Sequence, residues 1–218
     1  MSTKLKIDFV SDIACPWCAV GLGALEQALG ELKGEVEADI HFQPFELNPQ
    51  MPEGGQDLFE HLNQKYGSSQ EQQTQMYHNI KARGAEVGFE FHPTGRGRIF
   101  NTFDAHRLLH WAEVTAQPGA QHRLKKALLE AYQGRGEVIE DHDVLLNIVQ
   151  SLAMDVEAAR AVLQSDTYAE EVRQKEHFYT SAGIHSVPAV IINDRHLISG
   201  GQPAQVFAQA LREIAAQV

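Results

Sequence analysis

Apolar and polar side chains alternate over residues 4–10, which is the pattern of a β-strand with one buried face. Apolar residues then recur every three or four positions over 18–32, as on the buried face of a helix. Alternation returns over residues 35–47 and predicts a second strand. A strand, a helix and a strand in this order predict a parallel β-α-β unit.

The middle of the chain changes to helical periodicity after a proline- and glycine-rich loop at residues 48–56. Helices are expected over residues 58–66, 70–87, 101–116, 122–132, 144–153, 156–163 and 168–182. Asp143, Asp155 and Asp166 stand where the N-caps of the later helices belong. Strands return at 189–193 and 196–199, joined by a tight hairpin at Asp194-Arg195, and a last helix is expected over 204–216.

Composition narrows the class of protein. Hydrophobic residues make up 43% of the 218 residues, enough for a large core in one domain with an insertion or in two small domains. The formal net charge of −11 argues against nucleic acid and anionic membrane surfaces as partners. The N-terminus shows no signal-peptide pattern and no run is long enough to span a membrane, so we expect a cytoplasmic protein.

The candidate chemistry lies in one stretch, Cys15-Pro16-Trp17-Cys18, which holds the only two cysteines of the chain. Such a pair can form a disulfide, share a metal ion or be two inert buried thiols. A structural zinc site needs four ligands, and no second cysteine pair exists to supply them. The pair follows a predicted strand and opens a predicted helix, and this is the thioredoxin-type redox arrangement.

The position also predicts different roles for the two thiols. Free N–H groups and the helix dipole favour an anion at a helix N-terminus, where Cys15 is expected. Pro16 suits the first helical turn because its missing N–H costs nothing there. We therefore expect Cys15 to have the lower pKa and act as the nucleophile, with Cys18 as the resolving thiol.

Together these patterns predict an α/β protein with a thioredoxin-like fold and a large all-helical insertion. Residues 1–50 would form the N-terminal β-α-β part of the thioredoxin fold. Residues 51–184 would form the helical insertion domain, and residues 185–218 the C-terminal β-β-α part.

The chain resembles the DsbA-like thioredoxin-fold oxidoreductases, and among them the FrnE-type cytoplasmic branch. The strings that carry the resemblance are Asp8-Phe9, Cys15-Pro16-Trp17-Cys18, Phe42-Gln43-Pro44-Phe45, Leu47-Asn48-Pro49, Asn101-Thr102-Phe103-Asp104-Ala105-His106-Arg107, Val187-Pro188 and Ile198-Ser199-Gly200-Gly201-Gln202. They span nearly the whole chain. The cysteine pair and Val187-Pro188 are shared across the superfamily, whereas the string from Asn101 to Arg107 is more specific to this branch.

The resemblance implies that Pro188 is cis, faces the cysteines and keeps their sulfurs free of metal. The alternative is an ordinary trans proline at the start of a strand. Val187 would present its backbone N–H and C=O to a substrate. Trp17 and Gln202 are further candidate substrate-binding residues.

The resemblance also places the insertion over the cysteine pair as a lid. Phe103, Leu108 or Trp111 would approach the cleft, and Asn101 or Arg98 would supply a polar contact. Asn101 or Thr102 could equally well serve as a helix cap. Gly200-Gly201-Gln202 could hold a carboxylate such as that of glutathione, or form a plain turn.

Related families argue for one alternative function. The superfamily includes 2-hydroxychromene-2-carboxylate isomerases and kappa-class glutathione transferases, which typically carry a serine where Cys15 stands and use bound glutathione. Two thiols favour disulfide exchange instead. Trp17 stands where periplasmic DsbA often has a histidine, so a strongly oxidising potential is not expected. A glutathione-dependent isomerase or transferase acting on a small aromatic or polyketide molecule remains the alternative.

His106 and His110 lie four residues apart, with Glu113 further along, but no third ligand is assured and we expect no metal site. The sequence therefore predicts a thiol–disulfide oxidoreductase in which Cys15, Cys18 and Pro188 carry the reaction. Its partners would be small-molecule or peptide thiols and disulfides. No cofactor is expected beyond the redox-active pair, with glutathione as a candidate co-substrate. The sequence does not settle whether the protein is a dimer, or in which direction electrons flow. A third candidate function, besides the oxidoreductase and the isomerase or transferase, is a metal-binding or redox-sensing module.

Overall fold

The computed structural model describes residues 2–115 and 117–217. Strand β1 (Thr3–Ser11), helix α1 (Pro16–Glu31) and strand β2 (Val36–Pro44) form the expected unit, with β1 and β2 parallel and Phe9 paired to Phe42. Strands β5 (Ala189–Ile192) and β6 (His196–Ser199) extend the sheet, whose order is β2-β1-β5-β6. The pairs β1–β5 and β5–β6 are antiparallel. The protein thus has the α/β thioredoxin-like fold with a helical insertion.

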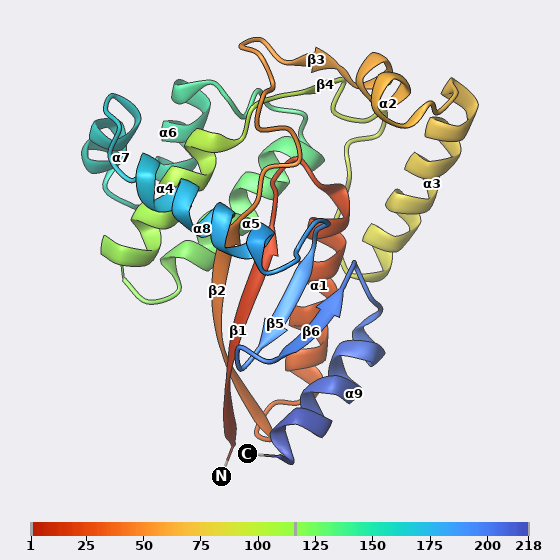
Figure 1. The fold of residues 1–218 in the computed structure, drawn as a ribbon, viewed down its shortest axis with the longest axis vertical. Helices are drawn as coiled ribbons and strands as arrows, with labels where there is room; N and C mark the ends of the chain where they lie inside the picture. Colours follow the sequence, from red (N-terminus) through yellow and green to blue (C-terminus); the bar gives the residue numbers. More distant parts are fainter. Residues whose placement is uncertain (1, 116, 218) are drawn as a thin grey trace.

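Alternation along β1 divides its side chains between the two faces of the sheet. Leu5, Ile7 and Phe9 pack with α1 and with the last helix, α9 (Ala204–Ala215), in one core. Val10 belongs to a smaller core with Tyr179 of α8 (Ala169–Ser181), which crosses the other side of the sheet (Figure 1).

The insertion is mostly helical. Its remaining helices are α2 (Leu58–Tyr66), α3 (Gln70–Glu86), α4 (Phe103–Thr115), α5 (Ala120–Leu129), the π-helical turn η1 (Glu130–Gly134), α6 (His142–Ser151) and α7 (Val156–Leu163). The expected end of the fourth helix, Ala116, lies outside the described residues. The sequence missed a short antiparallel ladder between β3 (Gln56–Asp57) and β4 (Arg98–Ile99), so the insertion is not entirely helical.

The helix caps and the hairpin turn were only partly predictable from the sequence. Asp155 caps α7 as expected, but Asp141 rather than Asp143 caps α6. The residue before α8 is Tyr168, in the left-handed region with φ of 64°, not Asp166. The hairpin turn is centred on Asn193 and Asp194, one residue earlier than predicted, because both have positive φ and Arg195 N–H closes the turn onto Ile192.

The insertion packs at the end of the sheet where β1 ends and α1 begins (Figure 1). Ile13 and Ala14, in the loop between these elements, belong to the same core as Leu108 and Trp111 of α4. The loop that leads into Cys15 therefore packs against the insertion. Among the described residues, no helix is both long and apolar enough to cross a membrane.

Candidate active site at the start of helix α1

Cys15 is the N-cap of α1 and Pro16 occupies its first turn, as the sequence predicted. The backbone of Cys15 is extended, and its carbonyl oxygen accepts a hydrogen bond of 3.1 Å from Cys18 N–H. Both thiols are free and buried, with Cys15 5% exposed and Cys18 0% exposed. Cys15 is thus the more exposed of the two residues, although only a small part of it is accessible.

The two thiols differ in acidity. A hydrogen bond from the Cys18 thiol lowers the pKa of Cys15, helped by the backbone N–H groups of Cys18 and Trp17, while burial and the charge of Asp12 oppose the change. Burial raises the pKa of Cys18 well above its usual value, and its interactions with Cys15 raise it further. This asymmetry is the one that a nucleophilic Cys15 and a resolving Cys18 require.

Val187 and Pro188 lie against the start of α1, where Val187 contacts Cys15 and Pro188 faces Gly21. The Val187–Pro188 peptide bond is cis. The Cys15 Sγ atom lies 3.5 Å from the carbonyl oxygen of Val187. Gly21 of α1 lets the helix approach, because a Cβ atom there would lie 3.0 Å from Pro188 Cγ. A substrate sulfur that reaches Cys15 would therefore meet the backbone of Val187.

The turn after β6 closes the same site. Gly200 N–H donates to the carbonyl oxygen of Pro188 at 2.8 Å. Gly201 packs against Trp17, since a Cβ atom there would lie 3.1 Å from the Trp17 carbonyl oxygen. The Gln202 side chain donates to Ser199 O at 2.8 Å within its own turn, which is the contact that a plain turn makes.

Arg98 and Asn101, the residues of the insertion that were expected to contact substrate, make hydrogen bonds within the protein instead. Arg98 donates to the carbonyl oxygens of Gly54 and Gly55, so its contacts give no support to a substrate-binding role. Asn101 Oδ1 accepts from Phe103 N–H at 2.8 Å and closes the turn before α4, which is the capping alternative. Phe103 itself stacks under Arg173, with the guanidinium carbon 3.7 Å from the ring centroid.

Sequence reasoning missed Asp12, a fully buried carboxylate three residues before Cys15. It accepts hydrogen bonds from Ala14 N–H at 3.0 Å, Leu47 N–H at 2.7 Å and the Thr102 hydroxyl at 2.8 Å. His106 Nε2 lies 3.5 Å away. An acidic residue at the end of an apolar strand was the available signal, since such residues are seldom buried without partners.

Two further side chains of the insertion bind the loop between β1 and α1. Arg96 donates to the carbonyl oxygen of Ala14 at 2.7 Å, and Gln133 donates to that of Ile13 at 2.7 Å. Lys125 of α5 is fully buried nearby, although its neighbour Lys126 is exposed. These residues carry no motif, and only the fold brings them to the loop.

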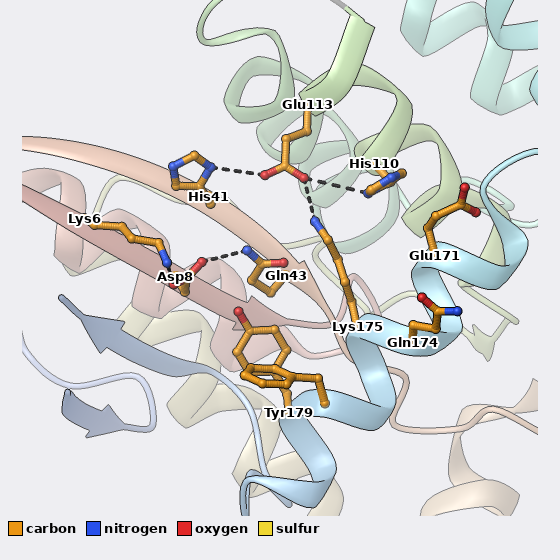
Figure 2. Close-up of a pocket in the computed structure, with 11 residues that line it drawn as sticks. Lys6, Asp8, His41, Gln43, His110, Glu113, Glu171, Gln174, Lys175 and Tyr179 are labelled. Atoms are coloured by element: carbon orange, nitrogen blue, oxygen red, sulfur yellow. Dashed lines mark hydrogen bonds and ion pairs between the residues drawn. The ribbon is translucent and has the colours of Figure 1, made fainter. Parts of the chain in front are cut away.

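A polar cleft of about 550 Å³, separate from the cysteine pair, lies over β1 and β2 beside α4 and α8 (Figure 2). Glu113 is its centre, bonded to His41 at 3.1 Å and to Lys175 at 2.8 Å. His110 faces this cleft whereas His106 faces Asp12, so the two histidines do not share a site. Within residues 2–115 and 117–217, no three side chains form a group that could hold a metal ion.

Comparison with known proteins matches this chain and its fold to one family. The model of the DSBA-like thioredoxin domain matches residues 6–212. A probable DsbA oxidoreductase, SCO1869 of Streptomyces coelicolor, is 32% identical, with a TM-score of 0.88 over 98% of this chain and 91% of the other. The Bacillus subtilis protein YwbO is 27% identical over 98% of both chains. A 2-hydroxychromene-2-carboxylate isomerase, 13% identical with a TM-score of 0.71 over 97% of both chains, shares the fold.

Proposed function

Because the chain belongs to the DSBA-like thioredoxin domain family, we propose that it exchanges disulfides through Cys15-Pro16-Trp17-Cys18. The observation that carries the proposal is the asymmetry of the pair beside Val187. Cys15 has a lowered pKa and contacts the Val187 carbonyl, whereas Cys18 is buried behind it with a raised pKa. A stable metal site or a pair of inert thiols would not need this difference.

The reaction has two exchange steps. The Cys15 thiolate attacks one sulfur of a substrate disulfide, so a Cys15–substrate disulfide forms and the other substrate sulfur leaves as a thiolate. Cys18 then loses its proton and attacks Cys15 Sγ, which releases the second substrate thiolate and leaves a Cys15–Cys18 disulfide. Two electrons pass from the pair to the substrate, and the same steps in reverse oxidise a dithiol.

The surroundings of Cys15 favour small or flexible substrates. The Cys15 residue is only 5% exposed, and the loop before it packs into the core of the insertion. A folded protein surface reaches such a sulfur less readily than a small disulfide or an extended peptide does. We therefore propose small-molecule or peptide disulfides as substrates. We further propose glutathione as the co-substrate and the cytoplasm as the compartment.

Turnover of two disulfides tests the proposal. With glutathione as the reductant, the protein should reduce a glutathionylated peptide much faster than it reduces insulin. Cys15→Ser should abolish both activities, and Cys18→Ser should leave only the exchange that needs one thiol. Activity towards a small aromatic substrate that survives Cys15→Ser with glutathione present would instead favour an isomerase or transferase. Stoichiometric metal lost on Cys15→Ala would favour a metal-binding module.

A further inference from the structure

Lys125 is a fully buried lysine of α5. Its side chain is 0% exposed, and its Nζ atom has no hydrogen-bond partner among residues 2–115 and 117–217. Burying an unpaired ammonium group is costly, so such a residue is rarely present for packing alone. An apolar side chain of similar length would fill the same space at lower cost.

The neighbours of Lys125 on α5 show which way it faces. One turn earlier, the Gln121 amide pairs with both backbone groups of Phe42 on β2, at 2.9 and 3.0 Å. Leu124 and Leu128 pack in the core that contains Ile13, and Leu129 packs in the core that contains α1. Lys125 therefore lies on the inner face of α5, between the contact of Gln121 with β2 and the core that Leu129 shares with α1.

The ionisable groups around Lys125 belong to this site. Burial lowers the pKa of Lys125, against the attraction of Cys18, Asp12 and Cys15, in decreasing order. Lys125 in turn lowers the pKa of Cys18, in opposition to the larger effects of burial and of Cys15. His106 of α4 also lies near Asp12, with its Nε2 atom 3.5 Å from the Asp12 carboxylate.

We propose that Lys125 is a positioning residue of the resolving step, whose buried cation offsets the negative charge of Asp12 and favours the thiolate form of Cys18. This inference rests on the proposed function. In that step Cys18 gives its proton to solvent, its thiolate attacks Cys15 Sγ, and the substrate leaves as a thiolate that is protonated by solvent. Lys125 keeps its proton throughout and acts only through its charge.

The test is a titration of Cys18 in a Cys15→Ser background, followed by the ultraviolet absorbance of the thiolate. Lys125→Met should raise the pKa of Cys18 by about one unit, the low end of the effect of a neighbouring opposite charge. The matched control is Lys126→Met, which removes the adjacent exposed lysine that pairs with Glu26 at 2.8 Å. This control should leave the titration of Cys18 unchanged. Lys125→Gln is a second neutral variant, and Lys125→Arg should restore the wild-type titration.

With both cysteines present, Lys125→Met should also slow the release of a preformed mixed disulfide about threefold at neutral pH. The tenfold loss of thiolate is partly offset because a thiolate of higher pKa is the better nucleophile. An unchanged Cys18 titration in both neutral variants, or an equal change in Lys126→Met, would overturn the proposal. The titration needs no substrate, so it separates failure of this inference from failure of the proposed function, which would appear as absent turnover in the wild type.

Discussion

The sulfur of Cys15 lies 3.5 Å from the carbonyl oxygen of Val187, 172 residues further along the chain. The insertion separates these residues in sequence, but the pairing of β1 with β5 brings them together at one end of the sheet. The site thus joins the start of α1 to the segment that leads into β5. Changes at this junction should alter thiol chemistry more than changes elsewhere on α1.

The acidity of the two thiols gives a first prediction. In the reduced protein, Cys15 should be alkylated about tenfold faster than Cys18 at pH 7, since each unit of pKa changes the thiolate fraction tenfold. The alkylation rate of Cys15 should reach half its maximum below the usual cysteine value of about 8.5, and that of Cys18 above it. Peptide mapping after timed alkylation measures both rates. Equal rates, or faster labelling of Cys18, would refute the assigned roles.

Two glycines of α1 provide a matched pair for the contact with Pro188. Gly21→Ala would place a Cβ atom 3.0 Å from Pro188 Cγ and 3.5 Å from Gly201 Cα. We expect it to lower the free energy of unfolding by about 1 kcal/mol and to change the alkylation rate of Cys15. Gly30→Ala meets nothing within 4 Å and should stabilise the protein by up to about 1 kcal/mol. Denaturant unfolding measures both, and similar effects of the two variants would count against close packing at Pro188.

A substitution of Asn101 distinguishes a role in capping α4 from a role in binding substrate. Asn101→Ala removes the acceptor of the Phe103 N–H group and should lower the free energy of unfolding by about 1 kcal/mol. Its KM for a small disulfide should stay close to that of the wild type. A raised KM with unchanged stability would instead show that Asn101 binds substrate.

Asp12 should make stability depend on pH. Although burial acts to raise it, the pKa of Asp12 is lowered by His106 and by the backbone N–H groups of Leu47 and Ala14. The contribution of the ionised carboxylate is therefore fully present above the ordinary aspartate pKa of about 3.9 and is lost as the pH falls through the folded value. Asp12→Asn should lower the free energy of unfolding by about 2 kcal/mol at pH 7.

The difference between Asp12→Asn and the wild type should shrink as the pH is lowered from 5 towards the acid limit of folding, to about half or less. Asp166→Asn, at an exposed position, is the matched control and should change stability by less than about 0.5 kcal/mol at any pH. A difference for Asp12→Asn that stays constant on acidification would contradict the lowered pKa.

The order of strands and helices could be predicted because the periods of apolar residues differ between them. The alternation of Leu5, Ile7 and Phe9 correctly places these side chains on one buried face. The helix caps were less predictable, because several residues near the start of a helix are suitable as its N-cap. Asp141 and Asp143 are both suitable caps, and only the backbone shows that Asp141 is the residue before the helix.

The cysteine pair was visible in sequence, but the charges behind it were not. Asp12 and Lys125 are both fully buried. Because charged residues usually lie at the surface, composition and periodicity would predict exposed positions for both. Arg98 was predicted to contact substrate, but in the structure its guanidinium donates to Gly54 and Gly55, which gives that prediction no support. Long-range pairing decides which polar groups reach the site, and local periodicity and motifs do not show that pairing.

The most direct test of the account is to trap the mixed disulfide. Cys18→Ser protein should be incubated with a peptide disulfide, and the adduct located by mass spectrometry of its proteolytic fragments. One stable adduct, linked to Cys15, should form, and none should form in Cys15→Ser protein, where the remaining thiol is buried and has a raised pKa. An adduct that forms equally well at Cys18 in Cys15→Ser protein, or no adduct in Cys18→Ser protein, would contradict it.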